Sequence, residues 1–152
     1  MSQAISIKTR ITYPLKKTYY LGKDRKSVEF LYKPLINIYI GNPLNNRKHI
    51  KTIECLVDSG ADFNLFPSNI ASLVGIDKVE NDSVVSFGGI GNSVLIGYKH
   101  KLSLFLPQKL NIEVYFSELQ HVPVLGRIGF FDQFRRVVFD ESRKKLVLQP
   151  VL

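Results

Sequence analysis

The stretch Leu56-Val57-Asp58-Ser59-Gly60-Ala61-Asp62 places a short polar turn directly after one apolar run and before another, Phe63 to Phe66. Asp58 brings a carboxylate and Ser59 a hydroxyl beside it. At Gly60 the backbone can adopt a conformation, or approach a neighbour, that a Cβ would block. A carboxylate held in this way can act as a general base. The alternative is an Asx or Ser turn between two strands, in which Asp58 only binds its own backbone.

A glycine-rich stretch lies further along the chain, Ser86-Phe87-Gly88-Gly89-Ile90-Gly91-Asn92. Strand-like runs flank it, which indicates a long hairpin whose tip can close as a lid. No Lys-Ser or Lys-Thr pair follows the glycines, so a phosphate-binding loop is not favoured. The alternative interpretation is an ordinary glycine turn.

A third stretch, Val122-Pro123-Val124-Leu125-Gly126-Arg127, is an apolar strand that ends in Gly and Arg. At Gly126 the backbone can pass very near another element, because no Cβ stands in the way. Arg127 adds a planar guanidinium suited to binding a carboxylate. Taken alone, the stretch is typical of a core strand followed by a surface Arg.

Together, in this order and with about 30 and then about 35 residues between them, the three stretches resemble the retropepsin-like (retroviral-type) aspartic proteases. The ending, Phe130 to Phe134 followed by Val137 to Asp140 and Leu146 to Leu148, is similar to that of small prokaryotic members. The likeness covers the chain from about residue 33 to the C-terminus. Asp58 to Asp62 is similar to the catalytic loop of that family, Gly88 to Gly91 to its flap tip, and Val124 to Arg127 to its apolar-apolar-Gly strand. Ser59 stands where the viral enzymes have Thr, and Asn92 stands where they have another Gly.

The resemblance implies a role for each matching residue. Asp58 would activate the lytic water, Ser59 would bond across a dimer, and Gly60 would offer its carbonyl to the substrate. Asp62 and Arg127 would pair and brace the loop. The implied set is Asp58, Ser59 and Gly60 for catalysis, and Ala61, Asp62, Gly88, Gly89, Ile90, Gly91 and Arg127 for substrate binding, with no cofactor and no metal.

Peptide hydrolysis by carboxylates needs two groups, one ionised and one protonated. The chain has a single Asp-Ser-Gly, since Asp82-Ser83 is followed by Val84, so a two-lobed enzyme within one chain is excluded. We therefore expect an aspartic endopeptidase in which two Asp58 carboxylates meet on the axis of a homodimer formed through the termini and act on an extended peptide or protein. The competing class is a catalytically silent homodimeric peptide-binding module of the same fold.

The composition fits one domain, with 152 residues, 45% of them hydrophobic and 22% charged. The longest apolar stretches are far shorter than the roughly 20 residues that span a bilayer. No secretory signal is recognisable at the start, so a cytoplasmic location is expected. One cysteine, Cys55, excludes an internal disulfide and a Cys-rich zinc site. His49, His100 and His121 have no metal-ligand spacing.

The net charge of +8 is unevenly distributed. Residues 1–51 carry eleven Lys and Arg against two acids, net +9, whereas residues 52–126 are net −4. A basic segment attracts nucleic acid and anionic surfaces, so a nucleic-acid-binding β-barrel is a third class. No nucleic-acid motif accompanies the charge, and nucleic acid is therefore not an expected partner.

Short β-branched and aromatic runs bounded by turn residues predict an all-β fold, a small closed antiparallel barrel with one or two short helices. Residues 33–152 are assigned to the protease-like domain. Residues 1–32 are assigned to a basic β extension packed on the same domain, a hairpin interpreted first as a dimer strand and alternatively as a pro-segment or docking arm. Helical turns are expected from Ser68, as N-cap, to Gly75, and around Phe130 to Phe134. The expected strands are Ile5–Tyr13, Val28–Tyr32, Leu35–Ile40, Thr52–Val57, Val84–Phe87, Ser93–Phe105, Leu110–Phe116, Val122–Leu125, Arg136–Asp140 and Lys145–Leu148.

Overall fold

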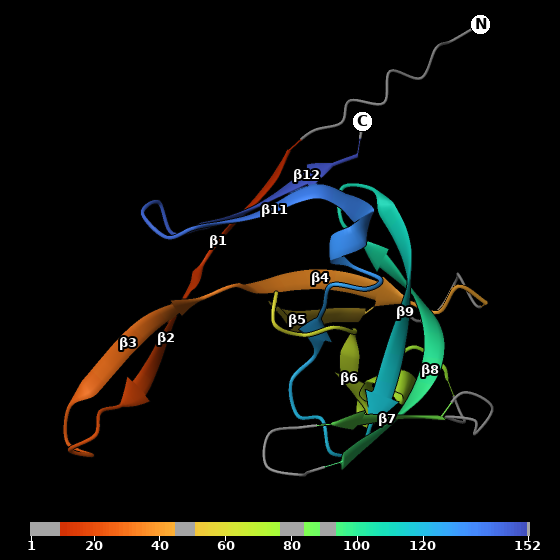
Figure 1. Ribbon diagram of the computed structural model, residues 1–152, viewed down its shortest axis with the longest axis horizontal. Coiled ribbons are helices and arrows are strands. Elements are labelled where there is room, and N and C mark those ends of the chain that lie inside the picture. Colours follow the sequence, from red (N-terminus) through yellow and green to blue (C-terminus); the bar gives the residue numbers. More distant parts are fainter. Residues whose placement is uncertain (1–9, 45–50, 77–83, 89–93, 152) are drawn as a thin grey trace, which may run out of the picture.

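The computed structural model describes residues 10–44, 51–76, 84–88 and 94–151. Within these ranges β-strands are the main secondary structure, with two short helices (Figure 1). The strands are β1 (Ile11–Pro14), β2 (Lys16–Leu21), β3 (Val28–Lys33), β4 (Leu35–Gly41), β5 (Lys51–Val57), β6 (Leu65–Pro67), β7 (Val84–Gly88), β8 (Val94–Phe105), β9 (Lys109–Ser117), β10 (Val124–Leu125), β11 (Phe134–Asp140) and β12 (Lys145–Pro150), and the helices are α1 (Ser68–Leu73) and the 3-10 turn η2 (Phe131–Gln133).

The central sheet closes into a barrel. Its strand order is β4-β5-β10-β6-β9-β8-β7, and β4 also pairs with β8, which closes the series from β4 to β8 and leaves β7 at its edge. The predicted all-β fold with a small closed barrel is confirmed. Most pairs are antiparallel as expected, but β10 runs parallel to β5 and β6 runs parallel to β9. β10 comes from a distant part of the chain and lies between β5 and β6. β5 and β6 therefore follow each other in the sequence but are not neighbours in the sheet.

The core follows from the two-residue periodicity of the strands. Ile36, Ile38 and Ile40 alternate inward along β4 and are at most 2% exposed, as expected for a strand with one buried face. Facing strands contribute Leu102, Leu104, Ile112, Val114 and Phe116 to the same cluster. This closed apolar interior gives the loops at the barrel rim a rigid base.

A second, three-stranded sheet has the order β1-β12-β11 and brings the first and last described strands together. Ile11 lies opposite Leu148 and Tyr13 opposite Leu146. The hairpin expected between the segments 5–13 and 28–32 is therefore not formed, because β1 pairs with the C-terminal strand instead. Leu15, which is 6% exposed and donates its N–H to the carbonyl of Lys144 at 2.9 Å, anchors the chain as it leaves this sheet.

The partner of β3 is β2, a strand that the sequence reading missed. The two form a two-stranded antiparallel sheet of their own, which we call the arm (residues 16–33). Figure 1 shows the arm projecting from the barrel, with the strand β3 continuing through Pro34 into β4. Asp24 closes its turn by accepting hydrogen bonds from the N–H groups of Lys26 and Ser27, both at 2.9 Å.

The helices are short, as predicted, but one cap differs. Ser68 is the first helical residue rather than the N-cap, because β6 runs up to Pro67 and this proline takes the capping position with φ −56°. Gly75, at φ +75°, follows the end of the helix as expected. Across the described residues, no helix has the length and apolar character needed to cross a membrane.

Candidate active site

Asp58 follows the last residue of β5 at the rim of the barrel. Its N–H donates to the carbonyl of Leu125 at 3.0 Å, and its carbonyl accepts the N–H of Ala61 at 3.2 Å. The side-chain Oδ1 accepts the N–H of Gly60 at 2.8 Å. Asp58 is half-buried, whereas Ser59 and Gly60 are exposed. The loop is thus an Asx-type turn that fixes one carboxylate oxygen.

Two neighbouring segments hold the end of β5 in place. On one side, the N–H of Leu56 donates to the carbonyl of Pro123 at 2.8 Å, ahead of the parallel register of β10 with β5. On the other side, the N–H of Val57 donates to the carbonyl of Pro34 at 2.9 Å. The backbone that carries Asp58 is therefore fixed by segments from two distant regions of the sequence.

Gly126 lies where β10 leaves the barrel, and the structure identifies the element that its backbone approaches. A Cβ at this position would lie 2.3 Å from the carbonyl oxygen of Phe63 and 2.8 Å from that of Ala61. No side chain fits in this space. The glycine expected to allow a close approach thus allows the segment after β10 to pack directly on the loop that follows Asp58.

Asn64 is a site residue that the sequence reasoning missed. Its side chain is fully buried. Oδ1 accepts the N–H of Gly126 at 2.8 Å, and Nδ2 donates to the carbonyl of Glu113 at 2.8 Å. The amide therefore connects the loop that follows Asp58 to β9 and to Gly126. The available signal was a single amide within the apolar run from Phe63 to Phe66, because a buried polar group requires partners.

The expected side-chain pair of Asp62 and Arg127 is not formed in the single chain. Neither residue belongs to the ion pairs found among the described residues, and both side chains are exposed. The two segments are joined through the backbone instead, because the N–H of Arg127 donates to the carbonyl of Ala61 at 2.9 Å and that of Ile128 to the carbonyl of Asp62 at 2.8 Å. Asp62 and Arg127 do border one hollow of about 510 Å³, together with Phe131.

The flap stretch is described only in part. Gly88 ends β7 and lies opposite Val94 of β8, so β7 and β8 are the two paired strands of the expected hairpin. The other three flap positions, Gly89, Ile90 and Gly91, lie outside the described residues. Their assignment to substrate binding stays a prediction.

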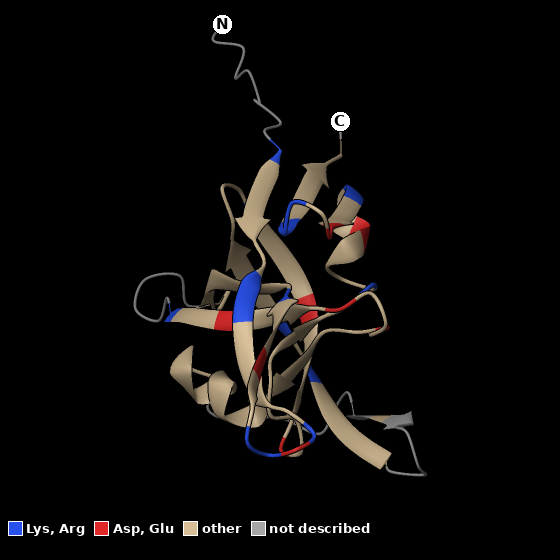
Figure 2. Cartoon of the chain, turned by 90° about the vertical axis from the view of Figure 1, so that its left-hand side faces the viewer, with Lys and Arg blue, Asp and Glu red and all other residues tan. Residues whose placement is uncertain are grey.

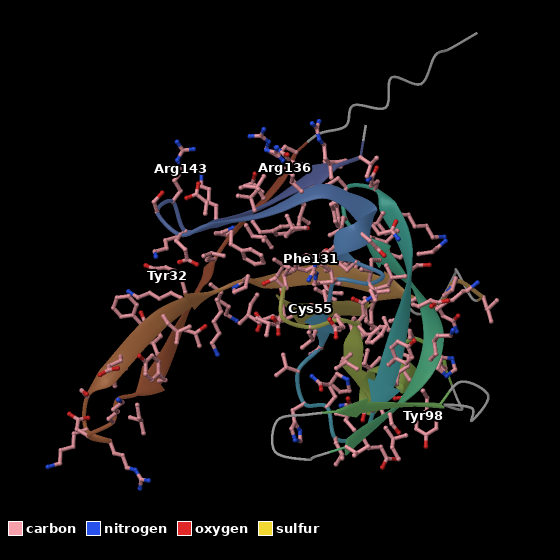
Figure 3. All side chains as sticks on the ribbon, in the orientation of Figure 1. Tyr32, Cys55, Tyr98, Phe131, Arg136 and Arg143 are labelled. Atoms are coloured by element: carbon pink, nitrogen blue, oxygen red, sulfur yellow. The ribbon has the colours of Figure 1, made fainter. Side chains whose placement is uncertain are left out.

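Other chemistry is limited in the part of the chain that the structure describes. Cys55 is buried inside the barrel (Figure 3), and burial raises the pKa of its thiol far above the usual range. A thiol that stays protonated is a poor nucleophile. Within the described ranges, no cluster of three or more His, Cys, Asp or Glu side chains could hold a metal ion.

The comparisons with known proteins support the fold through one solved structure. No protein-family model and no curated protein matches the chain by sequence. A retropepsin-like aspartic protease from Rickettsia conorii is similar in structure, with a TM-score of 0.59 and 16% identity over 92% of this chain and 98% of that one. EIAV protease, complexed with the inhibitor HBY-793, matches at a TM-score of 0.49 and 14% identity over 62% of this chain and 82% of that one. The likeness to the Rickettsia protein establishes the general retropepsin-like protease fold.

Proposed function

We propose that the protein is an aspartic endopeptidase whose active site forms when two copies bring their Asp58 side chains together. The observation that carries the proposal is the geometry of the loop. Asp58 directly follows β5, its N–H is bound by the carbonyl of Leu125 in β10, and its Oδ1 is held by the N–H of Gly60. A fixed, half-buried carboxylate on the retropepsin-like fold supports a catalytic group better than a simple turn.

One carboxylate is not enough for the reaction, which is why the proposal needs a second chain. Hydrolysis requires a base to take a proton from water and an acid to protonate the peptide carbonyl. Two carboxyl groups held about 3 Å apart cannot both ionise, so they share one proton and supply both functions at once. A two-fold axis beside Asp58 would create this pair from one gene product.

The chemical steps follow from the shared proton. The ionised Asp58 removes a proton from water while the oxygen attacks the carbonyl carbon, and the protonated Asp58 gives its proton to the carbonyl oxygen. The resulting diol then collapses, the C–N bond breaks, and a proton passes to the leaving nitrogen. The products are one carboxylic acid and one amine, and the pair of Asp58 residues is left with a single shared proton again.

The substrate class proposed is an extended peptide. β7 pairs with β8 and ends the strand order of the central sheet, so the hairpin presents a strand edge to which a peptide backbone can bond. Ala61, Asp62 and Arg127 lie close to Asp58 along the chain or through the backbone bond from the N–H of Arg127 to the carbonyl of Ala61. Their contribution to binding belongs to this proposal, as do Ser59 and Gly60 at the dimer axis.

The experiment is hydrolysis of an unfolded protein from acid to neutral pH by the wild type and by Asp58→Asn, at concentrations where both are dimeric. Asn keeps an oxygen for the N–H of Gly60 but cannot act as a base. Glu141→Gln removes a charge at a position where the carboxylate is exposed, 77% for the side chain, and serves as the matched control. We expect cleavage by the wild type and by Glu141→Gln, and loss of at least about 1,000-fold in Asp58→Asn.

Three results would count against the proposal. Equal cleavage by wild type and Asp58→Asn would remove the role assigned to Asp58. Binding of extended peptides without cleavage at any pH would instead assign the protein to the silent peptide-binding class. Tight, strongly salt-dependent binding of nucleic acid without either activity would favour the basic β-barrel class.

A further inference from the structure

The arm carries an apolar face with no partner among the described elements. In an antiparallel pair, residues directly opposite each other lie on the same face. Tyr19 is opposite Phe30, and Leu21 is opposite Val28. These four side chains, which we call the apolar face of the arm, are 63%, 51%, 64% and 67% exposed, respectively. A patch of this kind on a two-stranded sheet requires a covering surface, because such a sheet is marginally stable alone.

The side chains of this face are arranged rather than scattered. The rings of Tyr19 and Phe30 meet edge to face at 6.3 Å, and Phe30 meets Tyr32 at 6.0 Å. Lys17 Nζ lies 4.0 Å from the centre of the Phe30 ring. At the root of the arm, Lys144 Nζ lies 5.2 Å from the centre of the Tyr32 ring, so Tyr32 contacts the turn between β11 and β12 (Figure 3). The aromatic row is thus anchored at the barrel end and open towards the tip.

The charged residues of the arm lie mostly at its two ends, so the middle of both strands carries almost no charge. Lysines stand at the root and Lys23, Asp24, Arg25 and Lys26 at the tip (Figure 2). Between them, β2 is uncharged from Thr18 to Leu21. An apolar, aromatic centre bounded by charged residues is the arrangement found in protein interfaces.

We propose that the apolar face of the arm binds the barrel of a second copy of this chain, so that two arms clasp the homodimer. This inference rests on the proposed function, which places a two-fold axis beside Asp58. The arm begins beside the same point, because the carbonyl of Pro34 accepts the N–H of Val57, the residue before Asp58. An element that starts near the axis and projects away from its own barrel can reach the barrel of the partner.

Area and charge both favour a second copy. The four side chains leave about 450 Å² of mostly apolar surface exposed per arm, since each large side chain offers about 150–250 Å². Two arms therefore supply about 900 Å², and the barrel surface that they cover adds a similar area, so the total lies within the roughly 1,200–2,000 Å² of a stable interface. The arm carries six Lys and Arg against two acids, whereas residues 52–126 are net −4. A basic arm and an acidic barrel segment are complementary between copies.

The test compares two double variants of the full chain with the same composition. Tyr19→Ser with Leu21→Ser alters the apolar face, and Tyr20→Ser with Leu31→Ser alters the opposite face, where the exposed fractions are 44% and 39%. Sedimentation equilibrium gives the dimer Kd. We expect the first variant to raise Kd at least about tenfold and the control to change it by less than about threefold. Thermal unfolding of the two variants at low concentration checks that the barrel remains folded.

A second measurement locates the contact. Hydrogen exchange at high and low protein concentration is expected to show slower exchange of the β2 and β3 amides in the dimer, and faster exchange in Tyr19→Ser with Leu21→Ser. A wild type that stays monomeric at about 100 μM, or a Kd that the apolar-face variant leaves unchanged, would overturn the proposal. So would a variant that keeps its Kd and loses binding to phosphatidylserine vesicles, because the face would then serve a lipid surface.

The outcomes also separate this proposal from the proposed function. If the apolar-face variant weakens the dimer while wild type and Asp58→Asn cleave alike or not at all, the clasp stands and the protease assignment fails. If Asp58-dependent cleavage persists and the dimer is insensitive to the apolar face, the protease assignment stands and the clasp fails.

Discussion

Replacing Asn64 by Leu tests whether this buried amide holds the loop of Asp58. The change removes the acceptor for the N–H of Gly126 and the donor to the carbonyl of Glu113, both at 2.8 Å, inside a fully buried site. A buried backbone group left without its partner costs about 1–3 kcal/mol. Two such groups predict a loss of about 3 kcal/mol in the free energy of unfolding, or about 6–12 °C in Tm for a chain of this size.

Urea denaturation at fixed protein concentration measures the loss, because dimerisation would link stability to concentration. Asn69→Leu, at an exposed position on α1, is the control and should change stability by less than about 0.5 kcal/mol. A loss below about 1 kcal/mol in Asn64→Leu would refute the bracing role.

Asn64→Asp adds a pH dependence with a defined sign. The new carboxyl group keeps an oxygen for Gly126 but turns another towards the carbonyl of Glu113, so burial and this carbonyl raise its folded pKa above the unfolded value. The deficit in the free energy of unfolding of Asn64→Asp, relative to the wild type, should therefore be largest at neutral pH. It should shrink as pH falls through the folded pKa towards about 4, because the protonated group can donate to Glu113. A deficit that does not change with pH would contradict this geometry.

Three further predictions concern single residues. Gly126→Ala should destabilise the protein by about 3 kcal/mol or more, since its Cβ would lie 2.3 Å from the carbonyl oxygen of Phe63; denaturation showing less than about 1 kcal/mol would contradict the close approach. Cys55, whose thiol pKa is raised by burial, should react with a thiol reagent at least about 100-fold more slowly in the native than in the denatured protein, and equal rates would refute its burial. The N–H groups of Ser27 and Lys26 lower the pKa of Asp24. The contribution of Asp24 to the free energy of unfolding should therefore be present above about pH 4 and be lost as pH falls through the folded pKa. An NMR titration that gives an ordinary pKa for Asp24 would exclude these bonds.

The barrel could be predicted from the sequence because its strands have recognisable local patterns. Ile36, Ile38 and Ile40 alternate with polar or exposed residues, so β4 could be placed without knowledge of its neighbours. Gly126 could be interpreted as a point of close approach because glycine alone allows one. The structure adds only the identity of the approaching element, the loop at Phe63.

The features that escaped prediction are set by distant contacts. β2 begins with Lys16, Lys17 and Thr18, which show no apolar alternation, and it becomes a strand because β3 lies beside it. The hairpin expected for β1 was lost to β12, at the other end of the chain, because strand pairing depends on tertiary packing as well as on order in the sequence. Asn64 is a single amide whose two partners, Gly126 and Glu113, only the fold brings together.

The bonds around Asp58 also bear on what a second chain would contribute. The N–H of Asp58 is bound by Leu125 and that of Val57 by Pro34, and both bonds lie within one chain. The loop therefore has its geometry before any partner binds, and the partner would supply the second carboxylate and the covering surface rather than the order of the loop. It follows that dimer affinity and turnover per dimer should vary independently. Changes on the apolar face of the arm should alter dimer affinity, whereas changes at Asn64 should alter the position of Asp58 and hence the turnover per dimer.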